Sequence, residues 1–303
     1  MKTYRKIVTA ALSVVLAFGC VITANAYVCK QGDANSDGKV NIADATTIQQ
    51  YLIGKVTYKD MHYVASEVNG DGKVTIADAT FLQKQIAGLN PEKVGFAPLD
   101  GIDVSDWQED VDFNKIKADG YDFVIIRAGY GNELSQKDKR FEQHYKNAKD
   151  AGLFVGTYWY SYAADPADAQ LEANVFMQAI AGKTFEMPVF YDIEDNMHLS
   201  YSKADLTAIA NSFCKTMSDK NYLVGVYSNQ LFFNNYVDIA SLTDTDTIWL
   251  AEYDNKMNIE CDVWQYASDG TVDGYDGEID MNKCLKNYPS IIMQNGYNGY
   301  SVA

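Results

Sequence analysis

The stretch "VFYDIEDN", residues 189–196, decides how the central part of this chain is interpreted. Its first residues are β-branched and aromatic, which is typical of a strand. On a strand, Phe190, Asp192 and Glu194 point to one side, whereas Val189 and Tyr191 point to the other. Burying charge is costly unless the charge is paired or used. This strand end therefore predicts either a solvated edge or a functional site.

The sequence around this stretch alternates between strand-like and helix-like runs. Four helix-like runs separate the first five of eight strand-like runs, a pattern that predicts a parallel sheet covered by helices. Over residues 99–288 it predicts an α/β fold, a TIM-like (β/α)5(β)3 barrel whose last third lacks full helices. The predicted strands are 101–105, 123–131, 154–163, 187–195, 223–229, 247–254, 262–267 and 277–282, and the predicted helices are 112–120, 138–152, 165–182 and 202–220.

Carboxylates recur at the ends of these predicted strands. In such barrels the working residues lie at the C-terminal ends of strands. Asp103 is on the first strand, and Asp280 is on the last, which closes beside the first. We therefore expect Asp103, Asp192, Glu194 and Asp280 to meet in one site. Crowded carboxylates raise at least one pKa, which suits a general acid near neutral pH.

Aromatic residues on the same strands are candidates for binding a sugar, because flat apolar rings match pyranose faces. We expect Tyr160, Trp249 and Tyr253 to contact substrate. Arg127, late on the second strand, is expected either to pair with a site carboxylate or to contact substrate. Further aromatic residues on these strands are Tyr158, Trp264 and Tyr266.

The N-terminal third contains a repeat. "GDANSDGKVNIADAT" (32–46) returns as "SEVNGDGKVTIADAT" (66–80). Each copy places oxygen ligands at alternating positions around a glycine, the pattern of a calcium loop. We expect two structural Ca²⁺ ions, with weaker binding in the second loop, where Glu67 replaces the usual Asp. The predicted ligands are Asp33, Asn35, Asp37, the Lys39 carbonyl, Asn41 and Asp44 in the first loop, and Glu67, Asn69, Asp71, the Lys73 carbonyl, Thr75 and Asp78 in the second.

A helix-like run with apolar periodicity follows each loop, over residues 43–54 and 77–89. A duplicated loop and exit helix resembles a type I dockerin, over residues 30–90. The resemblance implies calcium-dependent folding and docking onto a cohesin module of a scaffolding protein. It also implies that Ile42-Ala43 and Ile76-Ala77 contact the cohesin. Because the pair is the same in both copies, we expect either repeat to be able to dock.

Four spaced motifs in the barrel region resemble the lysozymes (N-acetylmuramidases) of glycoside hydrolase family 25. They are "GIDVSDWQ" (101–108), "MPVFYDIED" (187–195), "WLAEYD" (249–254) and "DVWQYASDGTVDGYDGEIDMN" (262–282). The resemblance covers residues 99–288. It implies cleavage of the β-1,4 bonds between N-acetylmuramic acid and N-acetylglucosamine in peptidoglycan, with no cofactor for catalysis. The family's motif residues map onto Asp103, Asp192, Glu194 and Asp280.

The same resemblance assigns roles to two of these carboxylates. Glu194 is implied as the acid/base. Asp192 is implied to orient the substrate's 2-acetamido group, which attacks in a retaining, substrate-assisted route. Direct inversion by water stays open.

Two other functions are compatible with parts of the sequence. Chitinase-like barrels also end a strand in D-x-E, but their longer motif requires Asp where this chain has Met187 and Phe190. A non-catalytic glycan-binding barrel on the same scaffold is the second alternative. The presence of all four carboxylates disfavours it.

The N-terminus predicts a secretory signal. Lys2, Arg5 and Lys6 precede an apolar run that ends in Ala24-Asn25-Ala26, which predicts cleavage after Ala26. A retained membrane helix and lipid attachment at Cys20 are open alternatives, and no later segment is apolar enough to span a membrane. We therefore expect a secreted, extracellular protein that associates with a scaffold or a cell surface. The predicted divisions are 1–26 signal, 30–90 dockerin, 91–98 linker, 99–288 barrel and 289–303 C-terminal tail.

Charge, cysteine and histidine content limit which partners, disulfides and metal sites are expected. The formal charge of −16 argues against a nucleic-acid partner, whose phosphates need a basic face. Secretion permits disulfides, and Cys261 and Cys284 flank the last strand pair. A bridge between them and two free thiols are both open. The three histidines are scattered and show no zinc-ligand spacing.

Overall fold

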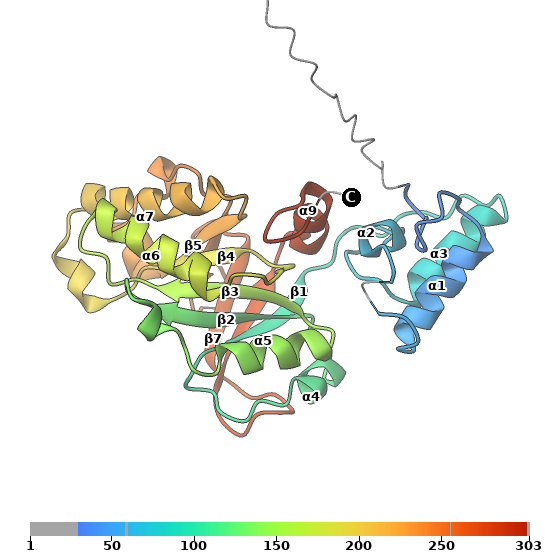
Figure 1. Ribbon diagram of the computed structural model, residues 1–303, viewed down its shortest axis with the longest axis horizontal. Coiled ribbons are helices and arrows are strands. Elements are labelled where there is room, and N and C mark those ends of the chain that lie inside the picture. The colour runs from blue at the N-terminus through green and yellow to red at the C-terminus, as the bar shows by residue number, and fades with distance from the viewer. Residues whose placement is uncertain (1–29, 58–59, 255, 302–303) are drawn as a thin grey trace, which may run out of the picture.

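The structure, a computed structural model, describes residues 30–57, 60–254 and 256–301. The predicted signal, its cleavage point and Cys20 lie outside these residues. A barrel and a smaller helical unit stand beside each other (Figure 1). Within the described part of the chain, no helix is both long and apolar enough to cross a membrane.

Eight strands close into the predicted barrel. Neighbours from β1 to β7 are parallel, and β8 runs antiparallel to both β7 and β1. The predicted α/β barrel of eight strands is therefore confirmed. The strands are β1 (Leu99–Val104), β2 (Phe123–Tyr130), β3 (Phe154–Tyr160), β4 (Val189–Asp192), β5 (Val224–Asn229), β6 (Thr247–Ala251), β7 (Val263–Gly270) and β8 (Ile279–Cys284).

Helices follow the first five strands, and no α-helix separates β6, β7 and β8 in the residues that the structure describes. The four predicted helices are present, and α8, which begins directly after β5, was not predicted. Polar caps begin several of them: Asp165 precedes Pro166 at the start of α6, and Ser202 starts α7. The helices are α4 (Phe113–Ala118), α5 (Phe141–Asp150), α6 (Pro166–Ala179), α7 (Lys203–Ser218) and α8 (Gln230–Asn235), with short 3₁₀ helices at Leu134–Gln136, Asn196–Ser200 and Ile239–Ser241.

Strand alternation sorts the barrel's apolar residues into two cores. Val189 and Tyr191 pack outward among helix residues, as predicted from the period of the strand. Phe190 packs inward with residues such as Phe123 and Trp249. Inward-facing Gly225 leaves room for this filling, because a Cβ there would lie 2.7 Å from the Phe190 ring. The closed barrel thus has a packed interior below its C-terminal mouth.

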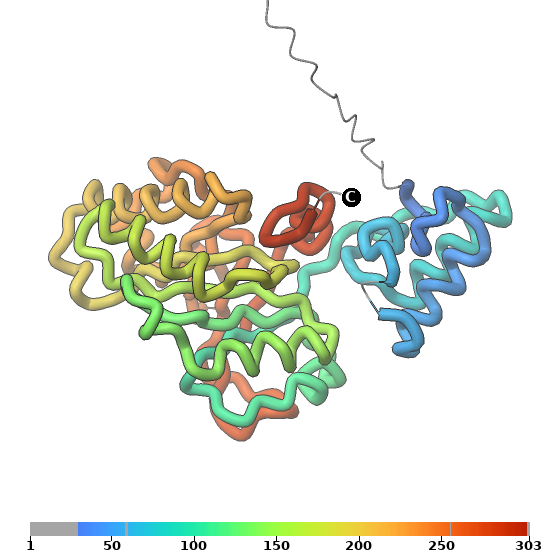
Figure 2. The backbone as a smooth tube through the Cα atoms, in the orientation of Figure 1, coloured from blue at the N-terminus to red at the C-terminus, as the bar shows by residue number. Residues whose placement is uncertain are grey.

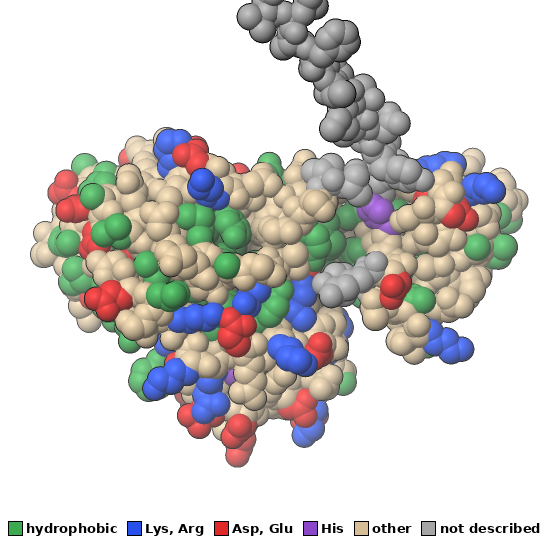
Figure 3. All heavy atoms as spheres, in the orientation of Figure 1, with side chains coloured by type: hydrophobic (Ala, Val, Ile, Leu, Met, Phe, Trp, Pro, Cys, Tyr) green, Lys and Arg blue, Asp and Glu red, His purple; other side chains and the backbone are tan. Residues whose placement is uncertain are grey.

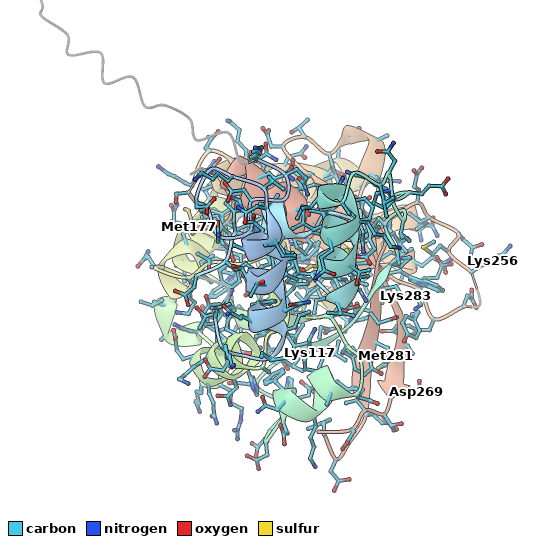
Figure 4. The ribbon with its side chains drawn as sticks, turned by 90° about the vertical axis from the view of Figure 1, so that its right-hand side faces the viewer. Lys117, Met177, Lys256, Asp269, Met281 and Lys283 are labelled. Atoms are coloured by element: carbon cyan, nitrogen blue, oxygen red, sulfur yellow. The ribbon has the colours of Figure 1, made fainter. Side chains whose placement is uncertain are left out.

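The helical unit is built from the two loop repeats. It contains α1 (Ile42–Leu52), the short α2 (Tyr63–Ser66), which was not predicted, and α3 (Ile76–Ile86). Asn41 caps α1 in a capping box with Asp44, and Thr75 and Asp78 do the same for α3. Two of the predicted ligands in each loop therefore also start the exit helix. Helices α1 and α3 lie side by side on the face turned away from the barrel (Figure 4).

Residues 289–301 of the predicted tail pack against the barrel. Helix α9 (Tyr288–Asn295) buries Tyr288 and Ile292 against the inward-facing core. Asn298 is fully buried, accepts from the backbone N–H of Leu223 and donates to the carbonyl of Met187. Figure 2 shows this segment in dark red between the barrel and the helical unit. It covers the N-terminal pole of the barrel.

The helical unit contacts that same pole through its second loop and through α2. Lys73 forms a 2.6 Å ion pair with Asp122, just before β2. Tyr63 packs edge-on against Phe154 at the start of β3, with ring centroids 5.5 Å apart. Since both contacts lie at the N-terminal ends of strands, the helical unit lies at the pole opposite the strand ends that carry the predicted site.

We predict that Lys73→Ala lowers the free energy of unfolding by about 1 kcal/mol, because Asp122 is largely buried and loses its cation. Lys39 holds the equivalent position in the first loop and is exposed, so Lys39→Ala is the matched control. Denaturation followed by tryptophan fluorescence measures this, since all four tryptophans lie in the barrel region. Equal effects of the two substitutions would show that the contact does not couple the two units.

Candidate active site

The four predicted carboxylates lie at the C-terminal mouth of the barrel. Asp103, near the end of β1, is the register partner of Asp280 on β8. Asp192 is the last residue of β4, and Glu194 lies just beyond it, so the strand is shorter than predicted. Asp103 and Asp192 are buried, while Glu194 and Asp280 are partly buried.

Burial raises the pKa of every member of this group, and the charge of a neighbouring carboxylate adds to it for Asp103, Asp192 and Glu194. Burial is the main cause for Asp192, and the charges of Glu194 and Asp103 add to it. Burial also raises the pKa of Glu194, which the charge of Asp280 raises further. The pKa of Asp280 rises to about 6 through burial. Burial and the neighbouring Asp280 raise the pKa of Asp103. The sequence analysis expected this convergence.

Neutral amides, which the sequence analysis missed, hold Asp103 in place. Gln265 Nε2 and Asn282 Nδ2 each donate to Asp103 Oδ2 at 2.8 Å. Gln265 is on β7 and Asn282 on β8, both buried. The sequence could have indicated Gln265, because it lies two residues after Val263 on the same strand, and side chains two apart on a strand point to the same side. Since Val263 is apolar, that side is the interior of the barrel.

Asp192 and Glu194 differ in their surroundings. Oδ1 of Asp192 is buried and has no hydrogen-bond partner among the described residues. Glu194 receives a long hydrogen bond, 3.4 Å, from Asn229 Nδ2. An unsatisfied buried acceptor is rare. Asp192 therefore keeps an unsatisfied, buried acceptor beside Glu194.

The structure corrects one of the predicted substrate contacts and gives a partner to another. Trp249 is only 1% exposed inside the barrel, so it offers no ring face to a sugar. Arg127 pairs through Nε with Asp138, at 2.8 Å, and its positive charge also lowers the pKa of Asp192, against the larger effect of burial. Strand position indicated that both residues were near the mouth, but not their depth or their partner.

The other two predicted contacts lie at the rim. Tyr253 is 56% exposed. Tyr160 is partly buried at the end of β3, and its hydroxyl donates to Asp195 at 3.1 Å. The loops after β1 and β3 add exposed Trp107 and Tyr162, which the sequence analysis did not single out. The mouth is thus a cluster of carboxylic acids below exposed aromatic rings.

The first repeat forms a loop closed around oxygen atoms. Asp33 accepts backbone N–H groups of Asp37 and Gly38, and Asp44 accepts those of Asn35 and Asn41. Asp33 and Asp44 are buried. No three His, Cys, Asp or Glu side chains form a metal cluster in the described ranges, so amide and carbonyl oxygens have to complete any coordination sphere. An oxygen-only donor set of this kind fits Ca²⁺.

The second repeat repeats this arrangement with one change. Glu67 stands at the first position and accepts the N–H of Gly70 at 2.6 Å, while Asp78 accepts those of Val68 and Thr75. Burial raises the pKa of both Glu67 and Asp78. A bound cation would offset this cost, so the residues of the second loop also fit Ca²⁺.

A cleft of about 1320 Å³ between the helical unit and the barrel contains none of the four carboxylates. Basic side chains gather on the barrel beside this hollow (Figure 3). Several form ion pairs, including Lys183 with Glu142 and Lys149 with Glu186. The cleft is therefore a boundary between the two units, separate from the site.

The barrel's two cysteines near the last strand pair are free thiols. Cys284 is buried, and its thiol donates to the carbonyl of Lys286 at 3.1 Å. Of the two arrangements left open by the sequence, the structure has the unbridged one.

Comparisons with known proteins agree with this geometry. The family model "Glycosyl hydrolases family 25" matches residues 102–275, more than half of the chain, and the model "Dockerin type I domain" matches residues 31–87. The autolytic lysozyme of Clostridium acetobutylicum is 32% identical over 189 residues, which are 61% of this chain and 55% of that protein. Lysozyme M1 of Streptomyces globisporus is 26% identical over 220 residues, which are 65% and 72%.

Solved structures share the barrel. The modular autolysin LytC from Streptococcus pneumoniae is 26% identical with a TM-score of 0.55, over 63% of this chain and 48% of that one. The bacterial lysozyme from Streptomyces coelicolor is 25% identical with a TM-score of 0.55, over 63% and 93%. This chain thus spans about half the length of the autolytic lysozyme and of LytC. The chain belongs to glycosyl hydrolases family 25 and carries a dockerin type I domain on the N-terminal side of its barrel.

Proposed function

We propose that this chain is a secreted peptidoglycan hydrolase that cleaves the β-1,4 bond between N-acetylmuramic acid and N-acetylglucosamine. The observation that carries the proposal is the cluster of Asp103, Asp192, Glu194 and Asp280, with raised pKa values, at the mouth of the barrel. A non-catalytic glycan-binding barrel has no need for four buried or partly buried acids. We also assign the barrel to the (β/α)5(β)3 arrangement, which its element order supports.

Glu194 acts as the general acid. Burial and the charge of Asp280 keep it protonated to higher pH than a free glutamate. Its proton passes to the glycosidic oxygen as the bond to the anomeric carbon breaks. In the second half of the reaction, ionised Glu194 takes a proton from the water that attacks the anomeric carbon.

Asp192 positions the neighbouring group. Its carboxylate accepts the N–H of the 2-acetamido group, which turns the acetamido carbonyl oxygen toward the anomeric carbon. That oxygen forms the new bond as the leaving sugar departs, and water later opens the ring that results. Exposed Tyr253 and partly buried Tyr160 supply ring faces for the sugars.

The dockerin attaches the enzyme to a cohesin-bearing scaffold and binds two structural Ca²⁺ ions. All four predicted recognition residues are exposed, and Ile42 and Ile76 are 56% and 59% exposed. They start α1 and α3, on the face turned away from the barrel (Figure 4). A scaffold bound there leaves the mouth of the barrel free for peptidoglycan.

We predict that Glu194→Gln lowers the release of muropeptides from purified peptidoglycan by roughly 100-fold or more, because the amide cannot donate the proton. Glu92→Gln, at an exposed position in the linker, is the matched control and stays active. Mass analysis of the released fragments should find reducing-end N-acetylmuramic acid. Full activity of Glu194→Gln would remove Glu194 from the mechanism.

We predict that Asn229→Ser moves the alkaline limb of the pH profile of kcat/KM to higher pH, by up to about one unit. The Asn229 amide favours ionised Glu194, so its removal raises the pKa of Glu194 further. A general acid works while protonated, so activity then persists to higher pH. Serine can still cap α8, where Asn229 accepts the N–H of Phe232. A limb that moves to lower pH would contradict this role of Asn229.

We predict that Ile42→Asp and Ile76→Asp each weaken binding to a type I cohesin by no more than about tenfold, whereas the double substitution abolishes it. Either repeat can then dock alone. Chelation of calcium should abolish binding of the unmodified chain, because the loops that start α1 and α3 lose their metal. Surface plasmon resonance measures all four cases. Complete loss from one single substitution would show that only one repeat docks.

A further inference from the structure

A buried amide on β7 connects the rim of the site to its floor. Gln265 Nε2 donates to Asp103 Oδ2 at 2.8 Å. Its Oε1 accepts the hydroxyl groups of Tyr253 at 2.8 Å and Tyr227 at 3.1 Å. Because Asp103 needs a donor, the amide has to turn its NH₂ toward Asp103 and its oxygen toward the two tyrosines. Every polar atom of the Gln265 side chain is therefore engaged.

A second amide holds the same oxygen from the other side. Asn282 Nδ2 donates to Asp103 Oδ2, and Asn282 Oδ1 accepts the indole N–H of Trp249 at 2.8 Å. An indole nitrogen only donates, so Trp249 fixes which end of Asn282 faces Asp103. Trp249 thus orients the floor of the site instead of stacking on a sugar.

The charge on Asp103 depends on these neutral amides. Asp280 on β8 is the register partner of Asp103, and burial together with the charge of Asp280 raises the pKa of Asp103. Arg127 on β2 is committed through Nε to Asp138. The titratable groups that act electrostatically with Asp103 come from five other elements: Asp280 on β8, Asp192 at the end of β4, Tyr158 on β3, Tyr227 on β5 and Tyr253 after β6.

We propose that Gln265 is a positioning residue, which fixes the orientation of Asp103 in its pair with Asp280 and links that pair to the rim through Tyr253. The proposal deepens the proposed function, since it concerns the same site. Tyr253 contributes an exposed ring at the rim and a hydroxyl bound to Gln265. Substrate that packs on the Tyr253 ring therefore contacts a residue whose hydroxyl is bound to Gln265, which in turn holds Asp103.

The test replaces the amide with a carboxyl of the same shape. At neutral pH, Gln265→Glu should lower kcat roughly tenfold or more, because a donor to a charged group is lost. The loss should shrink as the pH falls toward about 5, where the introduced carboxyl becomes protonated and donates as the amide did. Gln178→Glu makes the same change on the exposed face of α6 and should follow the unmodified enzyme at every pH.

A second substitution separates the ring of Tyr253 from its hydroxyl. Tyr253→Phe keeps the ring but removes one of the two donors to Gln265. It should lower kcat and leave KM nearly unchanged. If the Tyr253 ring only supports sugar packing, kcat should instead stay close to that of the unmodified enzyme, as KM does. That result would contradict the link between Gln265 and the rim.

A titration without substrate keeps this test independent of the proposed function. Carboxyl ¹³C NMR of the full chain should show the Asp103–Asp280 titration moved up by about one pH unit or more in Gln265→Glu, relative to Gln178→Glu. An unmoved titration, or a loss of kcat that does not vary with pH, would overturn the positioning role. If the unmodified chain releases nothing from peptidoglycan, the proposed function fails, while this titration still decides the role of Gln265.

Discussion

The site depends on burying Asp103 among other carboxylic acids, although no ion pair with a basic side chain is formed by Asp103 among the described residues. Asp103 is buried, and the hydrogen bonds on its Oδ2 come from two amides. Such a group stays at its place only if every donor around it is held rigidly, because a misplaced donor leaves a buried charge unsatisfied. The closed barrel supplies that rigidity. Its last strand, β8, runs beside the first and brings Asp280 and Asn282 next to Asp103.

The two ends of the barrel differ in what they carry. The C-terminal mouth carries the acids and the exposed rings. The N-terminal pole is covered by α9, by buried Asn298 and by the helical unit, whose Lys73 pairs with Asp122. Attachment at one pole therefore leaves the other open. The repeats are alike in sequence but differ in setting, because the second loop forms this ion pair with the barrel, whereas Lys39 at the equivalent position of the first loop is exposed.

Much of this could be predicted because it is local. Alternating apolar residues predicted the eight strands, and the period of residues 189–196 correctly assigned the inward and outward sides. Helix α8 was not predicted, since it continues directly from β5 with no loop to mark its start, and α9 was missed because its partners are far away in the sequence. Trp249 was assigned to the rim because strand parity gives the side on which a residue lies but not its depth. The partner of Arg127, Asp138, lies in the loop after β2, where no strand period applies.

The sequence by itself determined the residue types and their order: two oxygen-rich loops, eight strands and acids at strand ends. It also carried the motifs that identify the family. Only the tertiary structure decided which side chains meet. The contacts of Asp103 with Gln265 and Asn282 join residues far apart in the sequence, and they exist because barrel closure sets the register between β1, β7 and β8. Local pattern contains no information on that register, since it follows from packing the whole interior at once.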